Sequence, residues 1–306
     1  HLFPLLLKRY LNLSTRGYFL DNINGLPVED VYRMFGRWAA LKPALFMDVF
    51  LQSYFQKSAA GNIAPLKQKL AQEEAGADAQ TINLNRLARK IRKLARARKT
   101  ESRWSDYITT HTYTPEAEAE KVRYVQAFLT RHAPRTVLDL GCNTGRYSLL
   151  ASQSGARVVA IDSDYDSIDL LYQHARNEQA DVLPLWVDIA NPTPAVGFRN
   201  LERKRFLDRV KGEAVFALAL IHHLLITSRI PLGAICELFY DLTDAYVVVE
   251  FIDREDEMFQ SLLALREDIY ANVSRDAFLA TFTKQFDLID QCDLSGTRSL
   301  FTFKKK

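Results

Sequence analysis

The residues best suited to chemistry lie in a turn that follows a short apolar run. The run carries Asp139 near its end, and the chain then turns through Gly141 and Gly145. Glycine permits left-handed backbone and close approach of a ligand. Asn143 stands between the glycines, and asparagine is among the few other residues that tolerate left-handed backbone. The pattern predicts a strand, a tight turn and a helix over residues 146–154, bordering a ligand crevice.

Two further apolar runs also end in acids. One leads to Asp162, which Ser163 follows, and the next leads to Asp188, which Ile189 follows. The carboxyl ends of parallel strands meet at one edge of a sheet, so we expect the carboxylates to share one crevice. Asp162 lies about twenty residues beyond the turn, where a carboxylate accepts hydrogen bonds from ribose hydroxyls. Asp188, with the backbone of Ile189, is suited to an adenine amino group.

The same turn argues against a dinucleotide. The G-x-G-x-x-G pattern that rests a pyrophosphate on a helix is broken, because Asn143 and Arg146 replace its second and third glycines. A carboxylate at Asp139 would repel a pyrophosphate and attract a ligand that carries an ammonium group and a sulfonium centre. The alternative is a strand–turn–helix that binds no ligand.

From about Trp104 to Phe303 the sequence resembles the class I S-adenosylmethionine (SAM)-dependent methyltransferases. The resemblance implies an α/β fold, a doubly wound and mostly parallel seven-stranded sheet of Rossmann-like methyltransferase type, with SAM as the cofactor. The residues that we expect to bind SAM are Tyr113, Asp139, Gly141, Asn143, Gly145, Asp162, Ser163, Asp188 and Ile189.

Four segments look more narrowly like a nodulation-associated group of methyltransferase-like proteins, in which the methyltransferase domain ends a longer chain. The segments are residues 104–113, 217–224, 247–251 and 263–270. Glu202, Arg203 and Arg209 also match residues of that group, and either bind an anionic substrate or hold their segment in place. The resemblance supplies no substrate.

The amino-acid composition excludes few classes of binding partner. A net charge of +3 over 306 residues is too small to imply an electrostatically driven partner. No apolar run has the length of a membrane span, so we expect no membrane partner. The three cysteines, Cys142, Cys236 and Cys292, show no disulfide or metal spacing, which favours a reducing cytoplasm and predicts no metal site. The chain opens with His1 rather than Met, as a truncated chain would. No oligomeric state is predicted.

We expect two parts, a helical subdomain over residues 1–100 and a methyltransferase domain over residues 101–306. The helical part contains an amphipathic basic helix over residues 82–99. In the second part, strands alternate with helices, a helix is expected over residues 115–132, and an antiparallel hairpin around Ser295 and Gly296 ends the sheet. A long polar excursion over residues 191–212 separates the third and fourth strands.

Candidate chemistry follows the fourth and fifth strands. His222 and His223 lie just past the fourth strand, where active-site residues of open α/β sheets project. We expect one of them to act as a base, half-charged near neutral pH, although capping or packing is the alternative. Glu250, inside the fifth strand, is a predicted substrate contact or base, with a structural ion pair as the alternative.

An aromatic side chain that precedes the first strand is a candidate to contact the sulfonium group of SAM. Tyr113 is our choice to face that cation through its ring, with plain packing as the alternative. Lys121 is the basic residue expected nearest to the same mouth. No three of these groups have a spacing that requires a metal.

These features together predict a SAM-dependent methyltransferase that acts on a small molecule or glycan, at oxygen. An N-P-P-Y tetrapeptide typical of amino-directed enzymes is missing after the fourth strand, where residues 221–224 read IHHL. One alternative is an RNA-directed methyltransferase that tracks phosphates with the helix over residues 82–99. The other is a SAM-binding protein without catalytic activity, since fold does not fix function.

Overall fold

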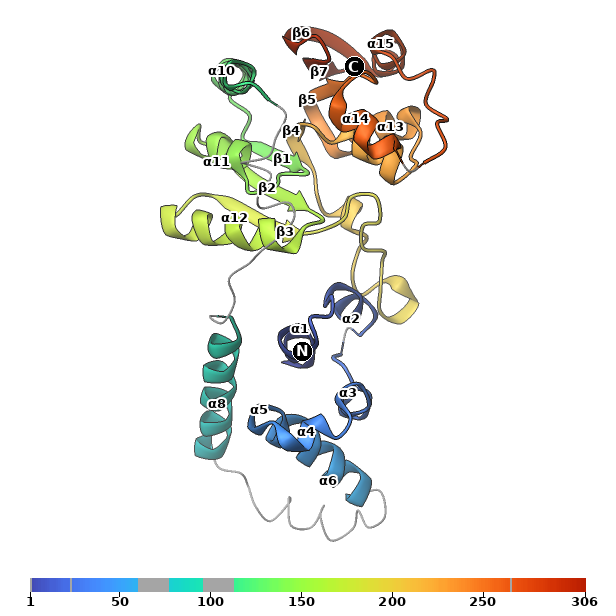
Figure 1. The fold of residues 1–306 in the computed structure, drawn as a ribbon. Helices are drawn as coiled ribbons and strands as arrows, with labels where there is room; N and C mark the ends of the chain where they lie inside the picture. The colour runs from blue at the N-terminus through green and yellow to red at the C-terminus, as the bar shows by residue number, and fades with distance from the viewer. Residues whose placement is uncertain (1, 23, 60–76, 96–112, 265) are drawn as a thin grey trace. The chain divides into compact units, whose positions relative to one another are not determined.

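The computed structural model describes residues 2–22, 24–59, 77–95, 113–264 and 266–306 (Figure 1). The chain separates into two compact units, residues 1–99 and 100–306. No helix among the described residues is both long and apolar enough to cross a membrane.

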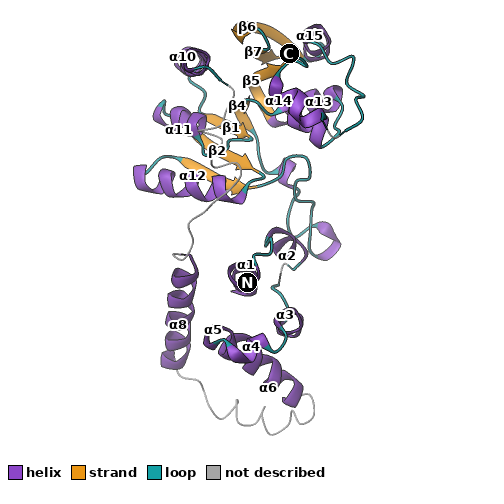
Figure 2. Ribbon diagram, in the orientation of Figure 1, coloured by secondary structure: helices purple, strands orange, loops and turns teal. Residues whose placement is uncertain are grey.

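The described residues of the first unit form helices joined by short loops (Figure 2). Its elements are α1 (Leu2–Leu11), α2 (Arg16–Asp21), α3 (Val28–Phe35), α4 (Trp38–Leu41), α5 (Pro43–Leu45), the π-helix η1 (Phe46–Phe50), α6 (Leu51–Ala59) and α8 (Ala77–Ala95). Leu6, Leu7, Val31 and Val49 form the centre of its core, and Leu94 packs against it. Apolar faces of short helices must meet in this way, because none of them is stable alone.

Basic side chains of α8 bind a buried carboxylate in this unit. Asp48 is 2% exposed, accepts a hydrogen bond from Arg86 Nη1 at 2.8 Å, and forms an ion pair with Lys90. Burial raises the pKa of Asp48, but these two cations outweigh it and hold the pKa below its ordinary value. Leu84 and Ile91 of this helix are exposed, whereas Arg86 and Lys90 lie on its packed side. Residues 96–99 of the expected basic helix lie outside the described residues.

The second unit is a seven-stranded sheet in the order β3-β2-β1-β4-β5-β7-β6. Its strands are β1 (Thr136–Leu140), β2 (Arg157–Asp162), β3 (Val182–Trp186), β4 (Gly212–Ala217), β5 (Thr243–Ile252), β6 (Phe286–Ser295) and β7 (Arg298–Lys305). The first five are parallel, and β7 is antiparallel to both β5 and β6. The predicted doubly wound sheet and its closing hairpin are confirmed.

Helices cover the two faces of the sheet separately (Figure 1). One face carries α10 (Pro115–His132), α11 (Arg146–Gln153) and α12 (Tyr165–Glu178), and the other carries α13 (Leu232–Leu242), α14 (Glu257–Leu263) and α15 (Arg275–Phe282). Helix α10 begins as its sequence predicts, with the side chain of Thr114 accepting the Ala117 N–H and Pro115 in the first turn. Strands β1 and β4 are buried on both faces, which explains why most of their residues are apolar.

The chain leaves β4 earlier than predicted. The strand ends at Ala217, and Ala219 has a φ of 57°, so the apolar residues that follow form a turn rather than more strand. The π-helix η4 (His223–Thr227) comes next, and the Ser228 N–H donates to the His223 carbonyl at 3.2 Å. This turn and helix carry both candidate histidines to the carboxyl edge of the sheet.

Candidate active site

The glycine turn after β1 is tied directly to β2. The N–H groups of Gly141 and Cys142 both donate to the Ile161 carbonyl, at 2.9 and 3.0 Å. Asn143 takes a φ of 50°, the left-handed conformation expected from its residue type. Gly145 has a φ of 86° and opens α11, and a Cβ there would overlap the side chain of Leu171. Glycine at position 145 is therefore required twice, by backbone angle and by packing.

Asp162 is the best-held carboxylate of this edge. Its Oδ2 accepts the N–H of Asn143 and its Oδ1 accepts the N–H of Asp164, both at 2.8 Å. Burial raises the pKa of Asp162, and these backbone bonds oppose the rise. A carboxylate has about four acceptor positions, so both oxygens retain capacity for hydroxyl donors. The site therefore fits a ribose diol on its own geometry.

Asp139 lies deeper than the sequence predicts. The side chain is 3% exposed, and its Oδ2 accepts a hydrogen bond from Ser148 Oγ at 2.6 Å. Burial raises its pKa to about 6, with the charge of Asp162 adding to the rise and Lys121 opposing it. A carboxylate that binds the ligand was expected to face the crevice. Instead, the Asp139 carboxylate lies beneath α11, whose Ser148 donates a hydrogen bond to it.

The third acid sits in a local turn. Asp188 follows β3, and its Oδ1 accepts the Ala190 N–H at 3.0 Å. Ile189 beside it is 8% exposed. Ser163 is exposed, and its carbonyl accepts the indole N–H of Trp186 at 2.9 Å. The three acids thus lie at or just past the carboxyl ends of three neighbouring strands, as predicted.

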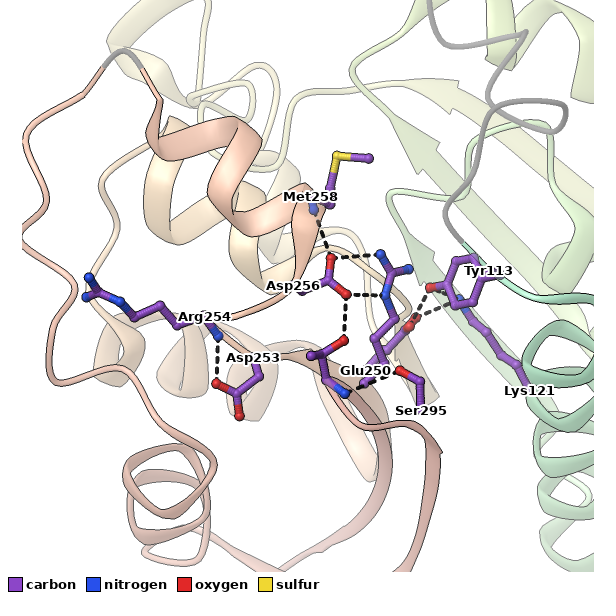
Figure 3. Close-up of polar contacts among 10 residues, drawn as sticks. Tyr113, Lys121, Glu250, Asp253, Arg254, Asp256, Met258 and Ser295 are labelled. Carbon is purple, nitrogen blue, oxygen red and sulfur yellow. Dashed lines mark hydrogen bonds and ion pairs between the residues drawn. The ribbon is translucent and has the colours of Figure 1, made fainter.

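A second polar group lies across the sheet, around Glu250 of β5 (Figure 3). Glu250 is completely buried, and its Oε2 accepts a hydrogen bond from Lys121 Nζ at 2.6 Å. Its Oε1 accepts the hydroxyl of Tyr113, which also accepts from Lys121 Nζ at 3.2 Å. The ammonium of Lys121 lies 4.9 Å from the ring centre of Tyr113 and 5.1 Å from that of Tyr147. Glu250 is therefore bonded on both oxygens, by the buried ammonium of Lys121 and by a phenol.

Arg298 closes this group from β7. Its guanidinium lies 4.3 Å from the ring centre of Tyr113 and bonds Asp256 through Nε at 2.7 Å and Nη2 at 2.9 Å. Burial raises the pKa of Asp256, but the Arg298 bonds hold it below its ordinary value. Two protein cations thus already contact the ring that was predicted to meet a ligand cation.

The two histidines lie together beside the same group. His222 is 2% exposed, and neither of its ring nitrogens has a hydrogen-bond partner among the described residues. Its ring centre lies 4.2 Å from that of His223. Burial lowers the pKa of His222 well below 6.5, helped by the charges of His223, Arg298 and Lys121. Burial also lowers the pKa of His223 to about 4.

Both imidazoles are therefore neutral at pH 7, which differs from the half-charged base expected from the sequence. The cause is desolvation, since a charged ring is disfavoured away from water. A buried ring without hydrogen-bond partners is costly. Such a ring is suited to a bound molecule that brings a donor or acceptor of its own.

Sequence reasoning named most of this site but missed several supporting residues. Ser148, Asp256 and Arg298 carried no recognisable signal, because each acts through a partner brought close only by folding. Segment 104–113 of the sequence resemblance lies outside the described residues except for Tyr113. Among the described residues, no group of three or more His, Cys, Asp or Glu side chains is arranged to hold a metal.

Comparison with known proteins gives matches of several kinds. A family model described as tellurite resistance protein TehB matches residues 102–193. The nodulation protein NoeA of Rhizobium meliloti is 30% identical over 309 residues, covering 99% of this chain. The match covers 64% of NoeA, so the chain spans less than two thirds of the length of that relative.

Two methyltransferases are also similar to this chain. The cypemycin N-terminal methyltransferase of a Streptomyces species is 50% identical over 48 residues, which are 15% of this chain and 20% of that protein. The crystal structure of the N-methyltransferase NodS from Bradyrhizobium japonicum WM9 covers 62% of this chain and 97% of its own, with 12% identity and a TM-score of 0.47.

Proposed function

We propose that the chain is a class I SAM-dependent methyltransferase that transfers a methyl group from SAM to a hydroxyl oxygen of a small molecule or glycan. The observation that carries this proposal is the position of His222. Its buried ring has no hydrogen-bond partner among the described residues and lies near enough to Lys121 and Arg298 for their charges to lower its pKa. Ligands of open α/β sheets bind at the carboxyl edge of the sheet.

The cofactor half of the crevice, defined as the carboxyl ends of β1 to β3, fits SAM by its donor set. Asp162 would accept from the ribose hydroxyls, because two backbone N–H groups already fix its orientation. Asp188 and the backbone of Ile189 would contact the adenine, and Ser163 borders the same end. The turn formed by Gly141, Asn143 and Gly145 would receive the methionine part beside Asp139. When bound, SAM supplies an electrophilic methyl group on a sulfonium centre.

The acceptor half, defined by Tyr113, Lys121, His222, Glu250 and Arg298, would position the hydroxyl and handle its proton. A neutral imidazole has one ring nitrogen that accepts a hydrogen bond. That nitrogen of His222 would accept the hydroxyl hydrogen and take the proton as the oxygen is methylated. Glu250 keeps its place through Lys121 and Tyr113 and would offer a hydrogen-bond acceptor to the bound molecule. His223 contacts the ring of His222 and restricts it.

The RNA-directed alternative has less support. Two cations of α8, Arg86 and Lys90, already bind the buried Asp48 within the helical unit. They are therefore occupied rather than displayed for phosphates. No observation favours RNA over a hydroxyl-bearing small molecule.

Cofactor binding is tested first, with S-adenosylhomocysteine as the calorimetric probe. Asp162→Asn should weaken its affinity about 10- to 100-fold, because hydrogen bonds to a charged group contribute about 1.5–3 kcal/mol. Asp181→Asn is the matched control, since Asp181 is an exposed acid at the opposite edge of the sheet, before β3. Equal affinity for both variants and the wild type would remove the ribose assignment.

Transfer is tested with SAM labelled on its methyl group. We expect label in methyl ethers formed from a pool of hydroxyl-bearing metabolites and oligosaccharides. Label in RNA or on nitrogen would overturn the acceptor assignment. Tight cofactor binding without transfer to any pool would favour the SAM-binding protein without catalytic activity.

A further inference from the structure

The connection between β3 and β4 is unusual for a doubly wound fold. Residues 187–211 carry no α-helix, and hold only the short 3₁₀ turns η2 (Phe198–Asn200) and η3 (Phe206–Asp208). In the ribbon this yellow segment extends away from the sheet (Figure 1). Loops of this length inside a compact unit are usually functional.

The base of this connection is well anchored. Phe206 is 3% exposed and packs in the sheet core, and its N–H donates to the Thr193 carbonyl at 3.0 Å. Val196 and Arg203 exchange two backbone hydrogen bonds, both of 3.1 Å, which close the loop above them. The segment therefore presents a defined tip rather than an unstructured excursion.

The tip, defined as residues 198–204, exposes two large apolar side chains. Phe198 is 77% exposed and Leu201 is 74% exposed, among the highest values for apolar residues of the described chain. Arg199 and Asn200 between them have φ values of 56° and 58°, a left-handed conformation that asparagine tolerates and that is costly for arginine. The backbone is thus held in a shape that keeps both apolar side chains in water.

Cations surround these side chains. Arg199, Arg203 and Lys204 are all exposed, and the charge of Lys204 acts on Asp208. Glu202 is the one acid of the tip, and Arg205 just beyond it bonds Asp208 at 2.9 and 2.6 Å. The sequence-based expectation that Arg203 and Arg209 hold the excursion in place applies in part, because Arg209 Nη2 bonds Thr193 Oγ1 at 3.5 Å and the Arg203 backbone pairs with Val196.

We propose that the tip docks the protein on an anionic lipid bilayer. Phe198 and Leu201 would enter the boundary between headgroups and acyl chains, while Arg199, Arg203 and Lys204 contact anionic headgroups. Two apolar side chains on a convex tip are too small for a stable protein interface, which buries about 800 Å² per partner. Nucleic acid would match the cations but offers no apolar layer for the two side chains.

Such docking needs no spanning segment. The expectation of no membrane partner came from the lack of a long apolar run, and that observation has no bearing on a surface-bound loop. The loop begins directly after Asp188 and Ile189, at the adenine end of the crevice. Docking there would bring the mouth of the crevice close to the bilayer surface.

The test is co-sedimentation of the full chain with vesicles of phosphatidylcholine alone or mixed equally with phosphatidylglycerol. Wild type should bind the anionic vesicles and lose binding as salt rises. Replacing Arg199, Arg203 and Lys204 by Gln should weaken binding about fivefold for each cation removed, since each is worth about 1 kcal/mol near such a surface. Phe198→Ser with Leu201→Ser should weaken it about tenfold or more.

Matched controls separate docking from general charge and general hydrophobicity. Arg131→Gln with Arg157→Gln and Arg176→Gln removes three exposed cations elsewhere, and Ile269→Ser removes an apolar side chain that is 64% exposed. Both controls should bind vesicles as wild type does. S-adenosylhomocysteine affinity, measured for every variant, reports that the second unit is folded.

Three outcomes would overturn the proposal. The first is that the wild-type protein binds anionic vesicles no more tightly than neutral ones. Apolar-tip variants that bind anionic vesicles as tightly as wild type would reduce the effect to charge adsorption. Tighter binding to an RNA oligonucleotide than to vesicles, lost on removing the cations alone, would assign the tip to nucleic acid.

Discussion

The cofactor half and the acceptor half of the crevice hold their carboxylates by different means. In the cofactor half, Asp162 and Asp188 accept hydrogen bonds from backbone N–H groups of nearby turns. In the acceptor half, Glu250 is held by side chains, with its cation 129 residues away at Lys121. The first arrangement follows from local backbone, and the second exists only once the sheet and α10 have come together.

This difference has an energetic consequence. Backbone donors stay in place when a side chain is replaced, so losing an acid of the cofactor half affects the ligand more than the fold. A buried ion pair leaves an uncompensated charge when one partner is removed. We therefore expect substitutions in the buried Lys121–Glu250 pair of the acceptor half to damage stability first and chemistry second.

The largest effect should come from Lys121→Met. It leaves Glu250 buried without its cation, which costs about 3–5 kcal/mol of unfolding free energy. Denaturant unfolding measures the loss. The double variant with Glu250→Leu should recover much of it, because no charge is then buried alone. If Lys121→Met is as stable as wild type, the acceptor half does not depend on its ion pair for stability, and the two halves do not differ in that property.

His222→Ala should have the next largest effect, on rate rather than stability. Loss of a proton acceptor reduces kcat by about 10²-fold or more, while the affinity for S-adenosylhomocysteine should stay unchanged. The pH profile of wild type sharpens the assignment. Because burial lowers the pKa of His222, its ring stays neutral through pH 6.5, and activity should fall only at more acidic pH. An activity loss centred on pH 6.5 would contradict the buried, neutral ring.

The smallest effect should be a pH-dependent gain in stability from Asp139→Asn. The pKa of Asp139 is raised from 3.8 to about 6 in the folded chain. Between these values the folded chain binds a proton that the unfolded chain has lost, so stability falls as pH rises and the cost is complete above about pH 6. Asp139→Asn should therefore gain on the order of 2 kcal/mol over wild type at pH 7.5, and much less at pH 4. Thermal unfolding at pH 4 and pH 7.5 measures the difference in stability between the variant and wild type. A difference that does not depend on pH would contradict a buried carboxylate with a raised pKa.

The contrast between the two halves also explains what the sequence could predict. Asp162 and Asn143 are 19 residues apart, within one strand–turn–helix–strand unit whose pattern is readable locally. The alternation of apolar runs and helices predicts the parallel part of the sheet, the last two runs predict its closing hairpin, and the family resemblance implies the seven strands. The bonds of Arg298 to Asp256 span 42 residues, and nothing in either local sequence marks the other. The depressed pKa of the histidines was equally hidden, because burial depends on the side chains that pack around η4.

The π-helix η4 makes the site sensitive to the number of residues in this segment as well as to their types. A π-turn holds one residue more than an α-turn, and such bulges occur frequently at functional sites. The hydroxyl of Tyr270 donates to the Leu225 carbonyl inside this wide turn, at 2.8 Å. Deleting a single residue from 223–227 would let the segment tighten into α-helix and rotate the residues beyond it by about 100°. The buried face from Leu224 to Ile226 would then lose its alignment with His222, although every side chain named in the crevice would still be present.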